Sequence, residues 1–228
     1  IKLCAKNGVT DITEAVICFD GIAFAQSKSN DSFSVTKKQL ALAVAAEVPN
    51  KDGKLIKNPY TNWSQIDSTL PNREIIIYGP PKSSGTRDAF EDMVLKSTFK
   101  KMIEYTSLYK KDKKKYTAYK KYHMVRQDGA YVPSGENDNI IVQKLNKNKK
   151  AFGIFGYSFL VENEDKVQAA KVNGMMPTPE SISSGKYPIS RSLFFYIKNS
   201  HAQAVPAMNK YVDMFMNEEM IGKEGILG

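Results

Sequence analysis

Cysteine and histidine, the residues that most often bind metals, are scarce in this chain. Its 228 residues include two cysteines and two histidines. There is no C-x-x-C pair and no cluster of cysteine with histidine, which argues against a zinc site. His123 and His201 lie far apart in the sequence, and each fits a surface position better than a metal ligand. We therefore expect neither a metal nor another cofactor.

The two cysteines leave two alternatives open. Thiols as close in the sequence as Cys4 and Cys18 form a disulfide in an oxidising compartment, or they serve as small buried hydrophobic side chains. The sequence does not choose between these alternatives.

The chain also lacks a long hydrophobic run. No stretch of about 20 apolar residues occurs, which is the length that a membrane-spanning helix needs, and no signal peptide is visible. There is no G-x-G-x-x-G dinucleotide motif and no G-x-S-x-G motif of a serine hydrolase. Neither histidine has an obvious partner for a catalytic triad. We therefore expect a binding protein and not an enzyme.

What the chain does have is an ordinary globular composition with an excess of positive charge. Hydrophobic residues make up 42% and charged residues 25%, and the length suffices for one large domain or two small ones. The formal net charge is +9. This charge indicates either lysines spread over a solvated surface or attraction to an anionic partner.

The stretch from Ser83 to Asp88 is the most informative one. It follows an apolar run at 75–78 and a Gly-Pro-Pro turn, and apolar residues at helical spacing follow it. This order predicts a strand, a tight turn and a helix. The first N–H groups of a helix have no intrahelical partner, and the macrodipole is positive there. The stretch therefore predicts a site for a tetrahedral anion. The candidate ligands are Ser83, Ser84, Gly85, Thr86 and Arg87.

A second helix N-terminus is predicted at 134–139, with Ser134, Gly135 and Asn137 as its candidate residues. Two alternatives are open for it. These residues only cap the helix that follows, or this N-terminus faces the same anion as the first one. In the second case, two helix N-termini on one cleft would double the number of unpaired donors.

A long apolar stretch at 15–25 is interrupted by Asp20. Apolar residues without alternation favour a strand that is buried on both faces, as in a parallel α/β sheet. Asp20-Gly21 is then either a turn or bulge, or the place where a carboxylate is held near a cleft. Near the C-terminus, the apolar periodicity of 204–220 predicts one amphipathic helix.

Residues 109–122 interleave lysine with tyrosine. Surfaces that bind nucleic acids use such mixtures of cations and stacking rings. The spacing of the tyrosines also suits one face of an amphipathic helix. A basic nucleic-acid-binding protein that uses this segment is the alternative to an anion receptor.

Six motifs, taken together and in this order, resemble the substrate-binding proteins of bacterial phosphate ABC importers. They are F-D-G-I at 19–22, S-G-T-R-D-A-F at 84–90, D-G-A-Y at 128–131, G-E-N-D-N at 135–139, G-I-F-G-Y at 153–157 and Y-P-I-S-R at 187–191. The resemblance implies an α/β, two-lobed periplasmic-binding-protein type II fold with phosphate in the interlobe cleft. It also implies a periplasmic monomer that delivers phosphate to a membrane permease and binds no nucleic acid.

The resemblance divides the chain into three segments. Residues 1–29 would hold part of lobe one and a hinge strand, 30–188 would form lobe two, and 189–228 would return to lobe one with a second hinge strand and the C-terminal helix. Because the chain begins in what resembles mid-domain sequence, we expect lobe one to be incomplete, with further phosphate ligands upstream. A degenerate or regulatory receptor is a further alternative.

The resemblance also implies roles for individual residues. Some members of the family carry an arginine where this chain has Pro80, so Arg87 would be the charged ligand here. Ser84 and Thr86 would supply hydroxyls. Asp88 would orient Arg87 or accept the phosphate proton, and Asp20 is the other candidate for an acceptor. An acceptor separates phosphate from sulfate, because sulfate carries no proton at neutral pH.

Overall fold

The structure is a computed structural model, and it describes residues 1–111, 124–135 and 137–221. The chain forms two compact units: unit 1 is Ile1–Asp20 with Arg191–Gly228, and unit 2 is Gly21–Ser190. The chain therefore passes from one unit to the other at residues 20–21 and 190–191. The sequence predicted these boundaries after residues 29 and 188.

The main sheet has the strand order β10-β1-β7-β5-β6, and β8 also pairs with β1. Its strands are β1 (Ile12–Ser27), β5 (Ile77–Gly79), β6 (Tyr131–Pro133), β7 (Phe152–Gly156), β8 (Val167–Ala169) and β10 (Ser190–Lys198). β5 is parallel to both β6 and β7, whereas β7 and β8 are antiparallel to β1.

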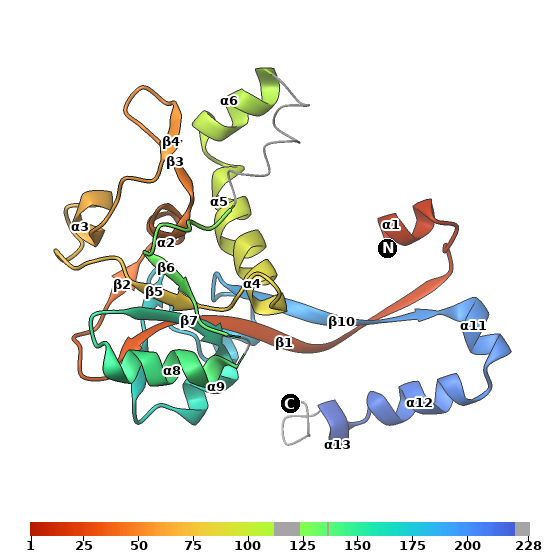
Figure 1. The fold of residues 1–228 in the computed structure, drawn as a ribbon. Helices are drawn as coiled ribbons and strands as arrows, with labels where there is room; N and C mark the ends of the chain where they lie inside the picture. Colours follow the sequence, from red (N-terminus) through yellow and green to blue (C-terminus); the bar gives the residue numbers. More distant parts are fainter. Residues whose placement is uncertain (112–123, 136, 222–228) are drawn as a thin grey trace. The chain divides into compact units, whose positions relative to one another are not determined.

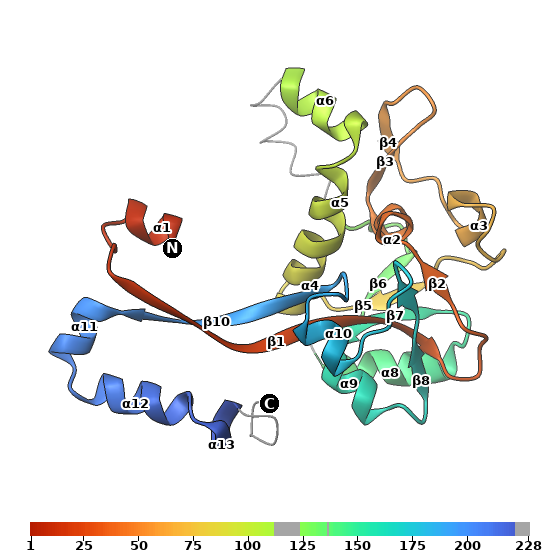
Figure 2. The same ribbon diagram turned by 180° about the vertical axis from the view of Figure 1, so that it is seen from behind.

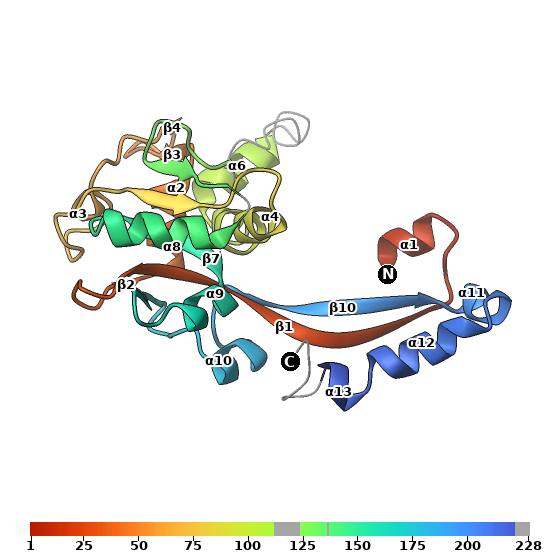
Figure 3. The same cartoon turned by 60° about the horizontal axis from the view of Figure 1, so that its bottom comes forward.

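Helices cover both faces of the sheet in unit 2. One face carries α8 (Asp138–Lys147) and α9 (Tyr157–Glu162). The other carries α2 (Lys37–Val44) and a continuous helical segment made of α4 (Gly85–Phe90), the π-helical η1 (Glu91–Lys96) and α5 (Ser97–Phe99). Figure 1 shows these two layers, and Figure 3 shows α8 lying along the strands.

The second half of β1 explains why polar and apolar residues do not alternate in this part of the sequence. Ile22 and Phe24 pack into the core on one face of the sheet, and Ala23 and Ala25 pack into the core on the other. Residues 21–27 are all buried, which confirms the predicted strand with two buried faces for this half. An aromatic cluster of Phe24, Phe33, Trp63 and Phe152 fills the first core.

Smaller elements surround this framework. The short strands β2 (Ser34–Val35) and β9 (Lys171–Val172) pair in parallel, and β3 (Glu47–Pro49) and β4 (Leu55–Lys57) form a hairpin. Among the described residues of unit 2, the other helices are α3 (Trp63–Ile66), α6 (Ile103–Lys111) and α10 (Pro179–Ser183). α10 lies beside β1 at Gly21 (Figure 2), where an added Cβ would stand only 2.5 Å from Cδ1 of Ile182. Gly21 therefore permits close packing inside a strand.

The described part of unit 1 contains the first half of β1, most of β10 and four short helices: α1 (Lys2–Lys6), α11 (Asn199–Ala204), α12 (Ala207–Phe215) and α13 (Glu218–Ile221). The predicted single helix at 204–220 is wrong. Val205 is extended (φ −120°, ψ 95°) because a residue before proline is pushed away from helical angles, and here Pro206 follows. Phe195 of β10 stacks on Phe215 of α12, with 5.2 Å between the ring centroids.

No helix in the described part of the chain is both long enough and apolar enough to cross a bilayer.

Candidate anion-binding site

The turn after β5 forms the predicted helix N-terminus. Ser84 is the N-cap of α4, with an extended backbone (φ −78°, ψ 134°), and its Oγ accepts a hydrogen bond from the Thr86 N–H at 3.2 Å. The hydroxyl proton of Ser84 does not take part in this bond, so it can still be donated. Gly85 and Thr86 are the first residues of the helix, where N–H groups lack intrahelical acceptors.

Arg87 is buried beneath this turn, with 7% of its surface exposed. Its Nε donates to Glu91 Oε1 at 2.6 Å and its Nη1 donates to the Pro80 carbonyl at 3.2 Å. The guanidinium lies 4.4 Å from the ring centroid of Tyr131, a cation–π arrangement. Within the described chain, no acceptor bonds to Nη2. The guanidinium is thus held in place, while the N–H groups of Nη2 can still donate to a ligand.

Glu91 is a site residue that the sequence reasoning missed. The carboxylate bonded to Arg87 belongs to Glu91, whereas Asp88 is exposed. The spacing of Arg87 and Glu91 is i, i+4, at which side chains on a helix meet, so this signal was present in the sequence. Ser83 is exposed at the start of the same turn.

The second predicted helix N-terminus lies beside the first. Ser134 donates its backbone N–H to the carbonyl of Gly79 at 2.9 Å, which joins the loop after β6 to the end of β5. Its hydroxyl donates to the Val132 carbonyl and accepts from Lys144 Nζ, and the residue is 4% exposed. The two helix N-termini therefore share the carboxyl edge of two adjacent parallel strands.

The remaining two candidates at this edge shape the start of α8. Asn137 is its N-cap, and Asn137 Oδ1 accepts from the Asn139 N–H at 3.0 Å. Gly135 has φ +86°, a conformation that favours glycine. The first alternative is therefore confirmed for Asn137, which caps α8, and a shared anion stays a prediction.

A third helix N-terminus, which the sequence reasoning did not identify as part of the site, lies at the same edge. Gly156, the last residue of β7, is the N-cap of α9, and its N–H donates to Asp138 Oδ2 at 3.0 Å. Asp138 is 6% exposed, and burial raises the pKa of its carboxyl group. The sequence signal for this helix start was a strand that contains glycines, followed by a helical pattern.

Tyr131 supports the turn from below. Its hydroxyl donates to the Pro80 carbonyl at 2.8 Å, and burial raises its pKa to about 12 although Arg87 acts in the opposite direction. Gly79 leaves room for this ring, since an added Cβ would stand 2.6 Å from Tyr131 Cζ. Gly79, Tyr131 and Arg87 therefore form a packed layer under the turn.

Asp20 belongs to unit 1 and lies inside β1, which excludes a turn at Asp20-Gly21, one of the alternatives left open by the sequence. Its Oδ2 accepts a hydrogen bond from Arg191 Nε at 3.2 Å.

Cys4 and Cys18 form no disulfide and are half-buried. The side chains of the lysine- and tyrosine-rich segment 109–122 lie outside the described part of the chain. The described residues contain no group of three or more Cys, His, Asp or Glu side chains that could hold a metal ion.

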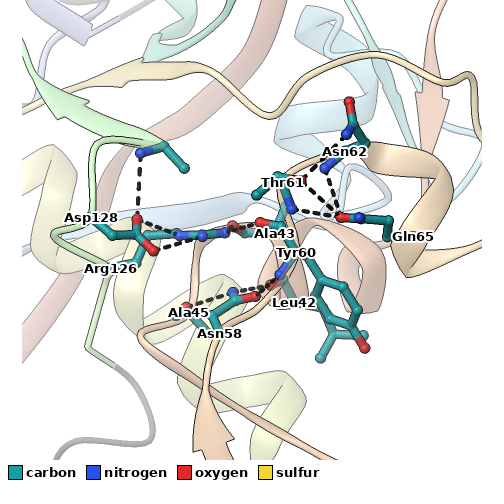
Figure 4. A network of polar contacts seen from close by, with 11 residues as sticks. Leu42, Ala43, Ala45, Asn58, Tyr60, Thr61, Asn62, Gln65, Arg126 and Asp128 are labelled. Atoms are coloured by element: carbon teal, nitrogen blue, oxygen red, sulfur yellow. Dashed lines mark hydrogen bonds and ion pairs between the residues drawn. The ribbon is translucent and has the colours of Figure 1, made fainter.

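Asp128, the first residue of the D-G-A-Y motif, belongs to a different polar network, which Figure 4 shows from close by. Arg126 bonds both carboxylate oxygens of Asp128, each at 2.7 Å, and its Nη1 donates to the carbonyls of Ala43 and Tyr60. Arg126 lowers the pKa of Asp128 by hydrogen bonding to its carboxylate. Asn58 bonds the carbonyls of Leu42 and Ala45. This network satisfies the C-terminal carbonyls of α2 and is structural.

Comparison with known proteins gives the family. A family model of the PBP superfamily domain matches residues 1–219, and the chain belongs to this superfamily. Among curated proteins, it is 29% identical over 209 residues to protein SphX of Synechococcus elongatus, covering 89% of this chain and 51% of that protein. It is 27% identical to the phosphate-binding protein PstS of Staphylococcus haemolyticus, covering 90% of this chain and 54% of that protein.

Solved structures confirm the fold. A crystal structure described as a "possible phosphate binding protein" of Planctomyces limnophilus superposes with a TM-score of 0.68 at 25% identity, over 95% of this chain and 65% of that one. PstS of Borrelia burgdorferi superposes with a TM-score of 0.62 at 21% identity, over 94% and 69%. The predicted α/β periplasmic-binding-protein fold is therefore correct. The chain spans about half the length of the curated relatives that it matches.

Proposed function

We propose that this chain is the substrate-binding component of a phosphate ABC importer and binds inorganic phosphate at the α4 N-terminus. The observation that carries the proposal is the meeting of the α4 and α8 N-termini at the ends of β5 and β6, joined by the bond from Ser134 to Gly79. Such an edge brings together the positive dipole ends of two helices, where a tetrahedral anion fits. The names of the related proteins agree with this ligand.

The proposed chemistry is binding without catalysis. The hydroxyls of Ser84 and Thr86 and the backbone N–H of Gly85 would surround the anion, with Arg87 supplying the fixed positive charge from beneath the turn. Because Glu91 and Tyr131 already hold the guanidinium, little side-chain entropy is lost on binding. Ser83 and Gly85 would complete the cradle through the turn itself.

The cellular role is part of the same proposal. A receptor of this kind works in the periplasm as a monomer, closes its lobes on phosphate and delivers it to a membrane permease. These steps, and the cleft between the lobes, stay predictions for this chain.

Isothermal titration calorimetry with phosphate, sulfate and a DNA oligonucleotide tests the ligand. We expect saturable one-to-one binding of phosphate, and a loss of about tenfold or more in affinity for Thr86→Val, which removes a hydroxyl that would bond to a charged oxygen. Thr106→Val is the matched control, because the Thr106 hydroxyl donates to the Ile103 carbonyl of its own helix and has no other partner among the described residues. Binding of the oligonucleotide alone, with a steep salt dependence, would contradict the proposal.

A further inference from the structure

A large cavity lies at the edge of the main sheet that is opposite to the candidate anion-binding site. It is lined by residues that precede β5 and β7 and by the loop that follows β1. Because β5 is parallel to β7 and β1 is antiparallel to it, these segments meet at one edge of the sheet. In Figure 3, α3 lies at this end of β5 and α4 lies at the other. The cavity belongs to unit 2 alone.

The size and the lining of this cavity indicate a hydrophilic small molecule. Its volume is about 990 Å³. Pockets for small molecules have volumes of roughly 300–1,000 Å³, so this one has room for more than an inorganic anion. Most of the side chains that line it carry an amide, a hydroxyl or a charge, and Ser32, Ser34 and Asn72 are exposed members of this lining.

Arg73 is a half-buried cation in this lining. Its Nε and Nη2 donate to the backbone carbonyls of residues 149–151, at 2.7–3.2 Å. Its Nη1 donates to Gln26 Oε1 at 2.6 Å, and the second N–H of Nη1 has no acceptor among the described residues. The guanidinium lies 4.0 Å from the ring centroid of Phe152. The group is therefore fixed in position with one donor left for a ligand.

The positive charge of Arg73 is not neutralised by a carboxylate. The other arginines of the chain, Arg87, Arg126 and Arg191, each pair with one. No carboxylate in the described residues pairs with Arg73. Burial lowers the pKa of Arg73 to about 10, so the guanidinium is still charged at neutral pH. A half-buried cation without a counterion is costly, and an anionic ligand would offset that cost.

Further charges of both signs line the cavity with Arg73. Lys149 and Lys150 are exposed and form no ion pair in the part of the chain that the structure describes. Asp31 and Glu74 are also exposed, and there they too form no ion pair. The cations suit a phosphate group, whereas the carboxylates repel one but accept hydrogen bonds from sugar hydroxyls. The mixture indicates a ligand that combines one anionic group with several hydroxyls.

We infer that this cavity is a second ligand site and that it binds a sugar phosphate. Arg73, Lys149 and Lys150 hold the phosphate monoester through charge-assisted hydrogen bonds. Glu74 and Asn72 bond to the hydroxyls of the sugar. The inference goes beyond the proposed function and does not depend on it, because the two sites have no residue in common.

Isothermal titration calorimetry of the wild-type chain with glucose 6-phosphate, glucose and methyl phosphate tests this chemistry. Glucose lacks the anionic group and methyl phosphate lacks the hydroxyls. Each should therefore bind about tenfold or more weakly than glucose 6-phosphate. The inference is overturned if glucose 6-phosphate does not bind, or if either of the other probes binds as tightly.

The double variant Lys149→Gln, Lys150→Gln locates the binding. Both side chains are exposed, and the backbone carbonyls that Arg73 bonds are kept, so the fold should be unaffected. Affinity for glucose 6-phosphate should fall about tenfold or more. The matched control is Lys51→Gln, Lys54→Gln, which removes the same charge at exposed positions between β3 and β4 outside the cavity lining. A comparable loss in this control would show that net charge, and not the cavity, governs binding.

Thr86→Val separates this site from the proposed phosphate site. It should weaken the binding of inorganic phosphate and leave glucose 6-phosphate unaffected, and the double variant at 149 and 150 should do the reverse. If only Thr86→Val weakens glucose 6-phosphate, that ligand binds at α4, and the inference is overturned while the proposed function stands. If inorganic phosphate does not bind but glucose 6-phosphate binds and requires Lys149 and Lys150, only the proposed function fails.

Discussion

Two buried arginines in unit 2 show how the same side chain serves a fold and a site. Arg126 is 5% exposed and Arg87 is 7% exposed, and each is bonded to a carboxylate. Arg126 bonds both oxygens of Asp128 and two backbone carbonyls, so every nitrogen of its guanidinium is used. Arg87 bonds one oxygen of Glu91 and one carbonyl, and it rests on the ring of Tyr131.

The difference teaches that burial and ion pairing do not by themselves identify a functional arginine. What distinguishes Arg87 is a nitrogen without a partner in the described chain, next to a helix N-terminus. Arg126 has neither feature.

Arg126→Ala should lower the free energy of unfolding by about 3–5 kcal/mol, because it leaves the Asp128 carboxylate and two carbonyls without their donor. Urea unfolding followed by the fluorescence of Trp63, the single tryptophan and fully buried in unit 2, measures this. Arg126→Lys should recover only part of the loss, since lysine lacks the two-pronged geometry. A loss below about 1 kcal/mol would contradict a structural role of this size.

Arg87→Ala should act mainly on affinity, raising the Kd for phosphate about tenfold to a hundredfold through loss of charge-assisted bonds. Its effect on unfolding should be smaller than that of Arg126→Ala, because Arg87 donates to one backbone carbonyl and one carboxylate oxygen, whereas Arg126 donates to two carbonyls and both oxygens of Asp128. Lys96→Ala, which removes one charge from the same helical segment at an exposed pair with Asp92, is the control. Equal affinity losses in both variants would indicate a general charge effect.

Gly79→Ala should disturb the layer that supports Arg87 and leave the Arg126 network intact. The added methyl group would overlap the Tyr131 ring, and relieving this overlap should cost about 1–2 kcal/mol of stability, with a weaker effect on phosphate affinity. Gly156→Ala is the control for stability, because its added Cβ would meet nothing closer than 3.7 Å. Unchanged stability of Gly79→Ala would show that the ring moves freely.

The smallest effect is the dependence of stability on pH. Arg126 holds the pKa of Asp128 below its usual value of about 3.9, so the native state binds this proton less tightly than the unfolded state does. The stabilisation is present above that usual value and is lost as the pH falls through the lower folded pKa. In a plot of the free energy of unfolding against pH, Asp128→Asn should reduce the fall at acid pH. The exposed Asp165→Asn should leave that fall unchanged.

Local features could be read from the sequence, and distant pairings could not. The α4 N-terminus, the α8 cap and the buried half of β1 were predicted, because each depends on neighbours within a few residues. The Arg87–Glu91 pair and the break at Val205–Pro206 also had local signals, which the reasoning overlooked. The contact between Asp138 and Gly156 had none, because it depends on how strands far apart in the sequence pair in the sheet.

The sequence by itself determined where helices begin, since capping side chains and unpaired N–H groups are properties of a short segment. Only the tertiary structure decided which of these N-termini meet. The parallel pairing of β5 with both β6 and β7 sets three helix starts at one edge. Strand order is fixed by long-range packing of both sheet faces, which no local pattern encodes.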